Sequence, residues 1–211
     1  MEIFYILGAI LLILLLACIC FHSYVTLFIV AITGKKRMQR KLYKGCKAND
    51  FLTISDLYVP TDENKTNHID TIIFANKYIY IITQLAQAGE IKTSLDDNMW
   101  RVVYDKKMTP IRNPLLHNRK VISKLVTTVP NLEESDMKSI VVVSKTCNLA
   151  NNINTDKEFV VLENKAMQLI LDIEKNSNED IIDPYEIERY AKAFYEYGLE
   201  TEKLIKEKKG K

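Results

Sequence analysis

The side chains that most often carry chemistry are few in this sequence, and they are scattered. The four cysteines are Cys18, Cys20, Cys46 and Cys147, and no two of them form a C-x-x-C pair. The three histidines, at positions 22, 68 and 117, are far apart. Zinc sites and disulfide frameworks need such residues at close, regular spacing. The sequence therefore predicts neither, and its cysteines fit a reducing compartment.

Basic residues are concentrated in one short run. Residues 34–47, GKKRMQRKLYKGCK, contain seven basic residues and no acidic one. From Ala48 onward there are 22 basic and 26 acidic residues, a net charge of −4. Nucleic-acid-binding domains usually carry a positive surface on the domain itself, and this balance does not indicate one. The seven residues of the run are Lys35, Lys36, Arg37, Arg40, Lys41, Lys44 and Lys47.

The segment before this run is apolar enough to cross a membrane. From Ile3 to Thr33 there is no Asp, Glu, Lys or Arg. About 20 apolar residues, each rising about 1.5 Å, cross a hydrocarbon core of about 30 Å. We therefore predict one transmembrane helix over residues 1–34, followed by a basic juxtamembrane helix over residues 35–48. Because the cations lie only on its C-terminal side, we expect a single-pass cell-membrane protein with its N-terminus outside and its soluble domain cytoplasmic.

The position of the basic run directly after this segment predicts that all seven cations contact anionic lipid headgroups. Two exported alternatives remain for the segment itself. A cleaved signal peptide begins with a charged region, which MEIFY lacks. The run LLAC at residues 15–18 faintly resembles a bacterial lipoprotein cleavage box, but the same charged region is missing. A membrane anchor is therefore favoured.

Hydrophobic patterning beyond the basic run predicts one α/β domain. Stretches rich in β-branched and aromatic residues indicate strands at 51–59, 69–74, 78–83, 100–104, 139–144 and 159–162. Asn113-Pro114 suits the cap and first turn of a helix that runs to about Thr128. Residues 164–211 are expected to form C-terminal helices, at 164–174 and from Asp183 onward. This order predicts a mixed β-sheet flanked by helices.

The order of these motifs resembles the nuclease-related domain (NERD) family, which is found mainly in bacteria and has the PD-(D/E)xK, restriction-endonuclease-like fold. The similar features are Ile69-Asp70 at the start of an apolar strand, Gly89-Glu90-Ile91, Trp100 and Asn113-Pro114-Leu115. The resemblance covers residues 51–162, and we place the nuclease-related domain at residues 49–163.

In active members of that family, an Asp at the start of one strand and a Glu-x-Lys at the end of the next carry the chemistry. The two carboxylates hold Mg²⁺, and the Lys positions and deprotonates the attacking water. Counting from Asp70 and from Gly89 puts Thr83 at the Glu position and Leu85 at the Lys position. His117 stands where relatives usually have Gln. One carboxylate holds Mg²⁺ only loosely, so the resemblance implies a domain that has lost nuclease activity.

We therefore assign no catalytic residue outright; the remnant candidates are Asp70, Thr83, Leu85 and His117. Asp70 is also the one metal-ligand candidate, and its alternative role is to accept hydrogen bonds from backbone N–H groups. Three other carboxylates, Glu90, Asp96 and Asp97, suit either migrated ligands or a solvated loop. The candidates for contact with nucleic acid are Arg112, Arg119, Lys120 and Lys124.

We expect a membrane-anchored, non-catalytic domain that binds a protein or nucleic-acid partner at the cytoplasmic membrane face. Two alternatives stay open. One is a Mg²⁺-dependent DNA nuclease with migrated active-site residues, and the other is a structural membrane component of a multiprotein assembly. The expected partners are the lipid bilayer and a protein or DNA. No small-molecule cofactor is expected, and Mg²⁺ is required only by the nuclease alternative.

Overall fold

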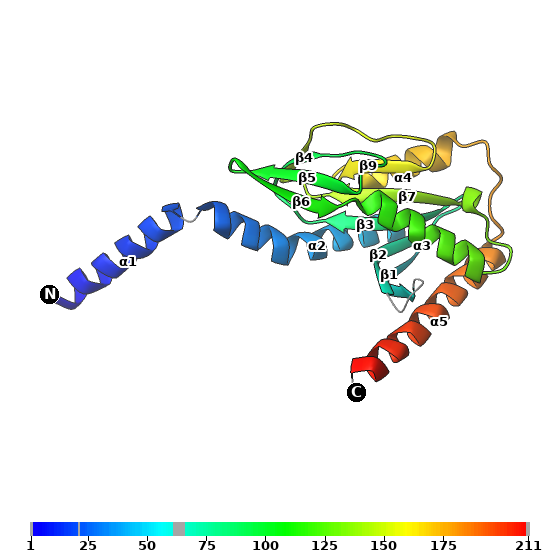
Figure 1. Cartoon of the computed structure of the whole chain (residues 1–211), viewed down its shortest axis with the longest axis horizontal. Helices are drawn as coiled ribbons and strands as arrows, with labels where there is room; N and C mark the ends of the chain where they lie inside the picture. The colour runs from blue at the N-terminus through cyan, green and yellow to red at the C-terminus, as the bar shows by residue number, and fades with distance from the viewer. Residues whose placement is uncertain (1, 21, 61–65, 210–211) are drawn as a thin grey trace.

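Two N-terminal helices precede an α/β body in the computed structural model, which describes residues 2–20, 22–60 and 66–209. They are α1 (Glu2–Cys20) and α2 (His22–Ala48). Figure 1 shows α1 leading away from the body and the C-terminal part of α2 lying against it. Within the described residues, no helix is both long and apolar enough to cross a bilayer. The span predicted over residues 1–34 includes Met1 and Phe21, which lie outside the described residues, and it stays a prediction.

The body contains two mixed β-sheets. The order of the first is β1 (Leu52–Pro60), β2 (Thr66–Phe74), β3 (Ile79–Leu85), β7 (Met137–Val143) and β9 (Glu158–Leu162). Strands β1 to β3 are antiparallel, whereas β3, β7 and β9 are parallel. The order of the second is β6 (Lys107–Arg112), β5 (Met99–Tyr104), β4 (Gly89–Lys92) and β8 (Cys147–Leu149). The predicted mixed α/β fold is confirmed, but there are two sheets and not one.

Helices cover both faces of the five-stranded sheet. On β3, Ile79 and Ile81 pack into one core cluster, while Tyr80 and Ile82 pack into another, as the two-residue period of a strand requires. The first cluster is closed by α3 (Pro114–Thr128) and α5 (Pro184–Lys209). The second is closed by α2 and α4 (Ala166–Asn176). The central strands are therefore buried on both faces, and their apolar runs reflect this.

The predicted start of α3 is confirmed. The Asn113 side chain accepts a hydrogen bond from the Leu115 backbone N–H at 2.9 Å, and Pro114 occupies the first turn. The amide of Asn113 also donates to three backbone carbonyls of the loop between β4 and β5. This cap therefore fixes the helix relative to the second sheet. The short 3₁₀ helix η2 (Glu134–Asp136) then leads into β7.

Three strands and one helix boundary differ from the sequence expectations. Strands β4, β6 and β8 were not predicted, because they are short or carry few apolar residues. The basic residues 35–48 do not form a separate helix but continue α2 from His22. This continuity matters for the site, because one helix begins in the apolar segment and its basic part then lies against the five-stranded sheet.

Candidate functional site

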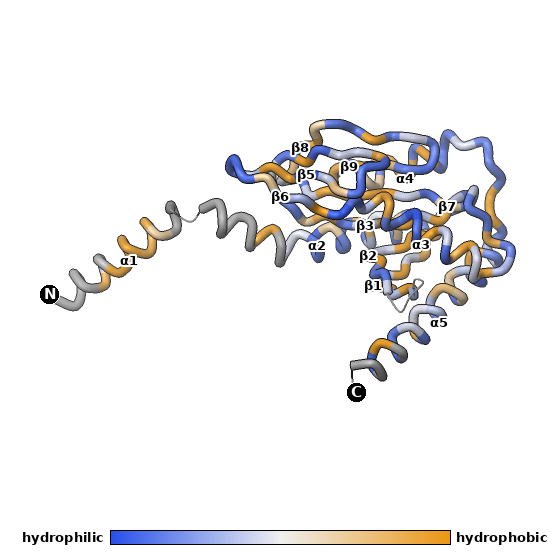
Figure 2. Tube along the Cα trace, in the orientation of Figure 1, coloured by the Kyte–Doolittle hydropathy of each residue, from blue (hydrophilic) through white to orange (hydrophobic). Residues whose placement is uncertain are grey.

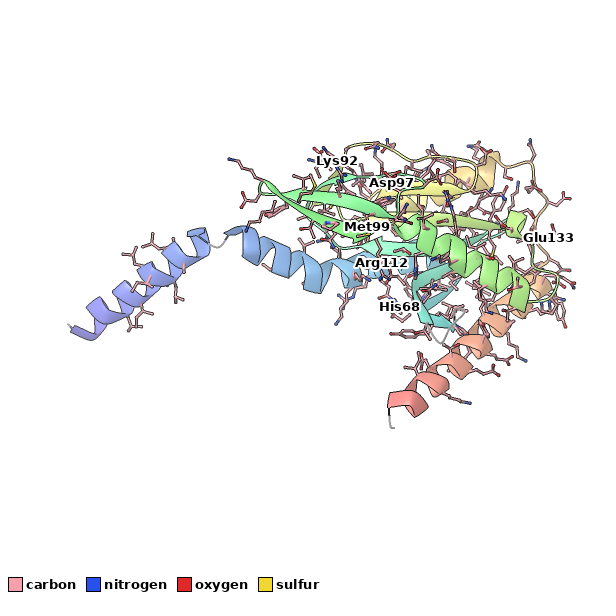
Figure 3. The ribbon with its side chains drawn as sticks, in the orientation of Figure 1. His68, Lys92, Asp97, Met99, Arg112 and Glu133 are labelled. Carbon is pink, nitrogen blue, oxygen red and sulfur yellow. The ribbon has the colours of Figure 1, made fainter. Side chains whose placement is uncertain are left out.

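The candidate site is centred on Asp70 in β2, which is only 7% exposed. Its Oδ2 accepts a hydrogen bond from the backbone N–H of Gln84 in β3 at 2.7 Å. Its Oδ1 forms an ion pair with Nζ of Lys35 in α2 at 2.9 Å. The ring of His68, which Figure 3 labels, lies in β2 with Nδ1 at 3.6 Å from the same oxygen. Both oxygens of the candidate metal ligand thus have partners inside the chain.

The strands are irregular at this point. Ile69 and Ile72 join the same core cluster, although strict alternation would place residues three apart on opposite faces. Across from this stretch, Asp56 of β1 has a φ of 57°, in the left-handed region that L residues rarely adopt. Its Oδ1 lies 3.3 Å from Nε2 of His68. Such irregularities re-aim side chains, and here they bring polar groups together next to α2.

The other remnant candidates make contacts of a different kind. Thr83 donates a hydrogen bond from Oγ1 to Oδ1 of Asn118 in α3 at 2.7 Å. Leu85 packs against the core cluster of the second sheet. His117 lies with Nε2 3.0 Å from the backbone oxygen of His68, so it links α3 to β2. Thr83 is therefore engaged by α3, whereas Asp70 is engaged by α2.

This donor set does not fit a Mg²⁺ site. Mg²⁺ requires near-octahedral oxygen ligands at about 2.0–2.1 Å, including one or two carboxylates. Asp70 is the one carboxylate among the remnant positions, Thr83 and Leu85 supply no second one, and the Lys35 ammonium lies 2.9 Å from Oδ1 of Asp70. In the described part of the chain, no group of three or more His, Cys, Asp or Glu residues is arranged to hold a metal ion.

A second buried carboxylate holds α2 against the sheet. Glu163 directly follows β9, and its side chain is 1% exposed. Its Oε2 accepts from Arg37 and its Oε1 accepts from Lys41, each at 3.1 Å. Burial opposes ionisation of this carboxyl, but the hydrogen bonds from Lys41 and Arg37 outweigh it and hold the pKa of Glu163 below its ordinary value. Arg37 also donates to Oγ of Ser144 at the end of β7.

The seven cations expected at the lipid surface thus fall into two sets. Lys35, Arg37 and Lys41 form ion pairs with carboxylates of the domain. The other four, which are exposed, are Lys36, Arg40, Lys44 and Lys47.

The basic residues expected to contact nucleic acid differ in exposure and in their partners within the chain. Arg119 donates Nε and Nη2 to the two carboxylate oxygens of Glu158, at 2.7 and 2.6 Å, and Nη1 to Asp96. These hydrogen bonds, that to Glu158 foremost, raise the pKa of Arg119 above its ordinary value. Arg112 and Lys120 are exposed on β6 and α3 (Figure 3 labels Arg112). Lys124 interacts within the chain.

The cavity next to Arg119 is acidic on balance. It has a volume of about 540 Å³ and lies between α3, β7 and the segment leading into β9. Its charged lining residues are Arg119, Lys157, Glu134, Asp156 and Glu158. With three carboxylates against two cations, it repels a phosphate backbone more than it attracts one.

Several residues of the site, or the partners that they bind, were not predicted from the sequence. Gln84, Asn118 and Glu163 were not singled out, and Lys35 was expected at the lipid surface. A usable signal existed for Glu163, because a carboxylate directly after a buried strand lies at the end of the sheet. No sequence signal indicated the ion pair of Lys35, because its partner Asp70 is 35 residues away and the pair exists only in the folded chain.

The mixed central sheet, the Asp70 carboxylate in the middle of β2 and the Asn-Pro helix α3 are features that the resemblance to nuclease-related domains implies. In agreement, the model of the nuclease-related domain (NERD) family matches residues 32–144. The chain belongs to this family. The match begins within α2 and includes Lys35, Arg37 and Lys41. No curated protein and no solved structure matches the chain.

Proposed function

We propose that this NERD-family protein is not a nuclease but a binding module, tethered to the cell membrane, that recruits a protein partner at the cytoplasmic face. The observation that carries the proposal is the ion pair between Lys35 and Asp70. Nuclease chemistry would need that carboxylate free for a metal ion. Here an internal cation neutralises it, so Mg²⁺ would have to compete with Lys35 for the carboxylate.

The residues around Asp70 support the loss of chemistry. The positions that would supply a second carboxylate and a lysine hold Thr83 and Leu85. At an effective dielectric constant of about 20, two unit charges 4 Å apart interact by about 4 kcal/mol. A divalent ion beside the Lys35 ammonium would be repelled, but by less than this figure, because the side chain is 53% exposed and solvent screens its charge. No second carboxylate therefore helps Asp70 to hold a metal ion. The ammonium of Lys35 competes with the metal ion for this carboxylate.

The apolar surface of α1 supports the tether. Its exposed side chains are Leu7, Ile10, Leu11, Leu12, Ile13, Leu14, Leu15 and Leu16. Figure 2 shows α1 orange over its described stretches, whereas α2 turns blue where it meets the body. A helix that is apolar all round needs an apolar environment. The proposed anchor is the whole stretch 1–34, and the basic run after it puts the domain on the cytoplasmic side.

A protein partner is favoured over nucleic acid by charge. The part of the chain after Lys47 has a net charge of −4, and the cavity beside Arg119 is acidic. On α5, Tyr185, Tyr195 and Leu199 are exposed, and large aromatic residues are enriched at protein interfaces.

The test of the proposal is a cleavage assay on the full chain in detergent, with plasmid and single-stranded DNA and either Mg²⁺ or Mn²⁺. The wild type, Asp70→Ala and the exposed control Asp180→Ala should all leave the DNA intact. Cleavage that Asp70→Ala abolishes would establish the nuclease alternative with migrated ligands. A salt-dependent shift of DNA mobility without cleavage would show that the partner is nucleic acid and not a protein.

The topology needs a separate test. Single cysteines introduced at Glu2 and at Lys208 can be labelled with a membrane-impermeant reagent from outside intact cells. The proposal expects labelling at position 2 only, and labelling at position 208 would overturn it.

A further inference from the structure

The exposed cations of α2 form a stripe along one face. Successive residues of an α-helix are 100° apart, so Lys36, Arg40, Lys44 and Lys47 fall within about 80° of one another over about 16 Å. Tyr43 lies in the same sector and is 59% exposed. On the opposite side of the helix, Met38, Leu42 and Cys46 are buried in the core. We call these four cations and Tyr43 the outer stripe.

The outer stripe contains the cations of α2 that do not pair with carboxylates of the domain. Lys35, Arg37 and Lys41 bind Asp70 and Glu163 and lock the helix onto the sheet. Among the described residues, the four cations of the outer stripe take part in no ion pair with the domain. Their positive charge is therefore available for an external partner, and the rigid packing of α2 fixes the direction in which it is presented.

The same face of α2 carries an exposed apolar residue before the cations. Ile29 falls in the sector of the outer stripe, two turns before Lys36, and is 53% exposed. An exposed apolar residue therefore precedes the cations on this face, and an exposed tyrosine lies among them. A bilayer shows the same order from hydrocarbon to headgroup, and tyrosine is favoured at that boundary.

We propose that the outer stripe binds the phosphates of anionic phospholipids, so that residues 35–48 of α2 lie on the membrane surface and carry the domain on their opposite face. The inference rests on the proposed membrane tether and adds an orientation and a lipid preference to it. Each Lys or Arg near an anionic surface contributes about a fivefold gain in occupancy, and salt screens this attraction.

The test uses the full chain with Tyr43→Trp in nanodiscs of phosphatidylcholine, alone or with phosphatidylglycerol, doped with a lipid that carries a nitroxide in its headgroup. The native Trp100 is 1% exposed and gives a constant background. Quenching of the fluorescence of the introduced indole should be strong in the anionic discs and weak in neutral ones. It should fall when ionic strength rises from about 0.1 M to about 1 M, because the Debye length shrinks from about 10 Å to about 3 Å.

A charge-matched pair of variants isolates the outer stripe. Changing its four cations to Gln should lower the occupancy in anionic discs, derived from the quenching, by at least about fivefold. Changing four other exposed lysines to Gln should leave it unchanged: Lys92, Lys106, Lys145 and Lys175. Of these, Lys92 lies across the body from α2 (Figure 3).

The outcomes separate the two claims. If the chain does not co-purify with discs of either composition, the tether fails and this inference falls with it. If the chain co-purifies but the quenching does not change with lipid charge or with ionic strength, only the outer stripe proposal is overturned. It is also overturned if the stripe variant keeps its quenching yet loses binding to a fluorescent DNA duplex, since the stripe would then be a nucleic-acid surface.

Discussion

Glu163→Gln should loosen α2 from the body while keeping the shape of the side chain. In the wild type the carboxylate accepts charge-assisted hydrogen bonds from Arg37 and Lys41, each at 3.1 Å. Hydrogen bonds to charged groups contribute about 1.5–3 kcal/mol each. The side chains of Arg37 and Lys41 are 35% and 50% exposed, so solvent screens both contacts. We therefore expect a loss of about 1–3 kcal/mol in the free energy of unfolding.

The effect should depend on pH in a definite direction. The pKa of Glu163 is lowered in the folded chain, so its ionised form stabilises the fold above the unfolded value of about 4.3. That stability is lost as the pH falls through the lower, folded pKa. The free energies of unfolding of wild type and Glu163→Gln should therefore differ by the full amount at pH 7 and become equal in acid.

The assay is denaturant unfolding of the full chain in mild detergent, followed by circular dichroism between pH 7 and pH 3. Hydrogen exchange of residues 35–47 reports the detachment of α2 directly and should quicken in the variant. Glu179→Gln, at an exposed position with no side-chain partner in the described structure, is the matched control. Equal stability of wild type and Glu163→Gln at pH 7, or a difference that grows in acid, would refute this reasoning.

Three further substitutions test how the site is held. Asn118→Ala removes an amide that bonds to β3 and β7, and should cost about 2–3 kcal/mol of unfolding free energy, whereas a loss below about 0.5 kcal/mol would contradict its role. Arg119→Ala breaks the bidentate pair with Glu158 and should cost about 1–2 kcal/mol, against no measurable change for Lys120→Ala. Gly89→Ala places a Cβ 2.3 Å from a backbone oxygen of β5 at a φ of 102°, and should lower the melting temperature by several degrees in thermal denaturation.

The parts of the fold that depend on local chemistry could be predicted from the sequence. The cap at Asn113 and the buried central strands follow from residue type and spacing, and both are confirmed. The hairpin of β5 and β6 could not be recognised. Its turn residues Asp105 and Lys106 both have positive φ, at 49° and 62°, without the Gly or Asn that usually marks such a turn. Strand β6 also contains Pro110, which fits only an edge strand.

The candidate site could be predicted only in part. Asp70, Thr83 and Leu85 were located by motif order, but the partners of Asp70 depend on how α2 packs. A run of cations after an apolar segment reads as a lipid surface, and nothing in the run distinguishes Lys35 from Lys36. The packing of Met38 and Leu42 sets the rotation of the helix and so decides which cations face the domain. Tertiary packing, and not local sequence, therefore decides which cations pair with the domain and which stay exposed.

The most direct test of the central claim is calorimetric titration of the full chain with Mn²⁺, which binds oxygen ligands and gives a measurable heat. With Asp70 paired to Lys35 and no second carboxylate at Thr83, we predict no binding that differs between wild type and Asp70→Ala at millimolar Mn²⁺. One equivalent of Mn²⁺ bound by the wild type and lost in Asp70→Ala would contradict the account and restore a metal site to this domain.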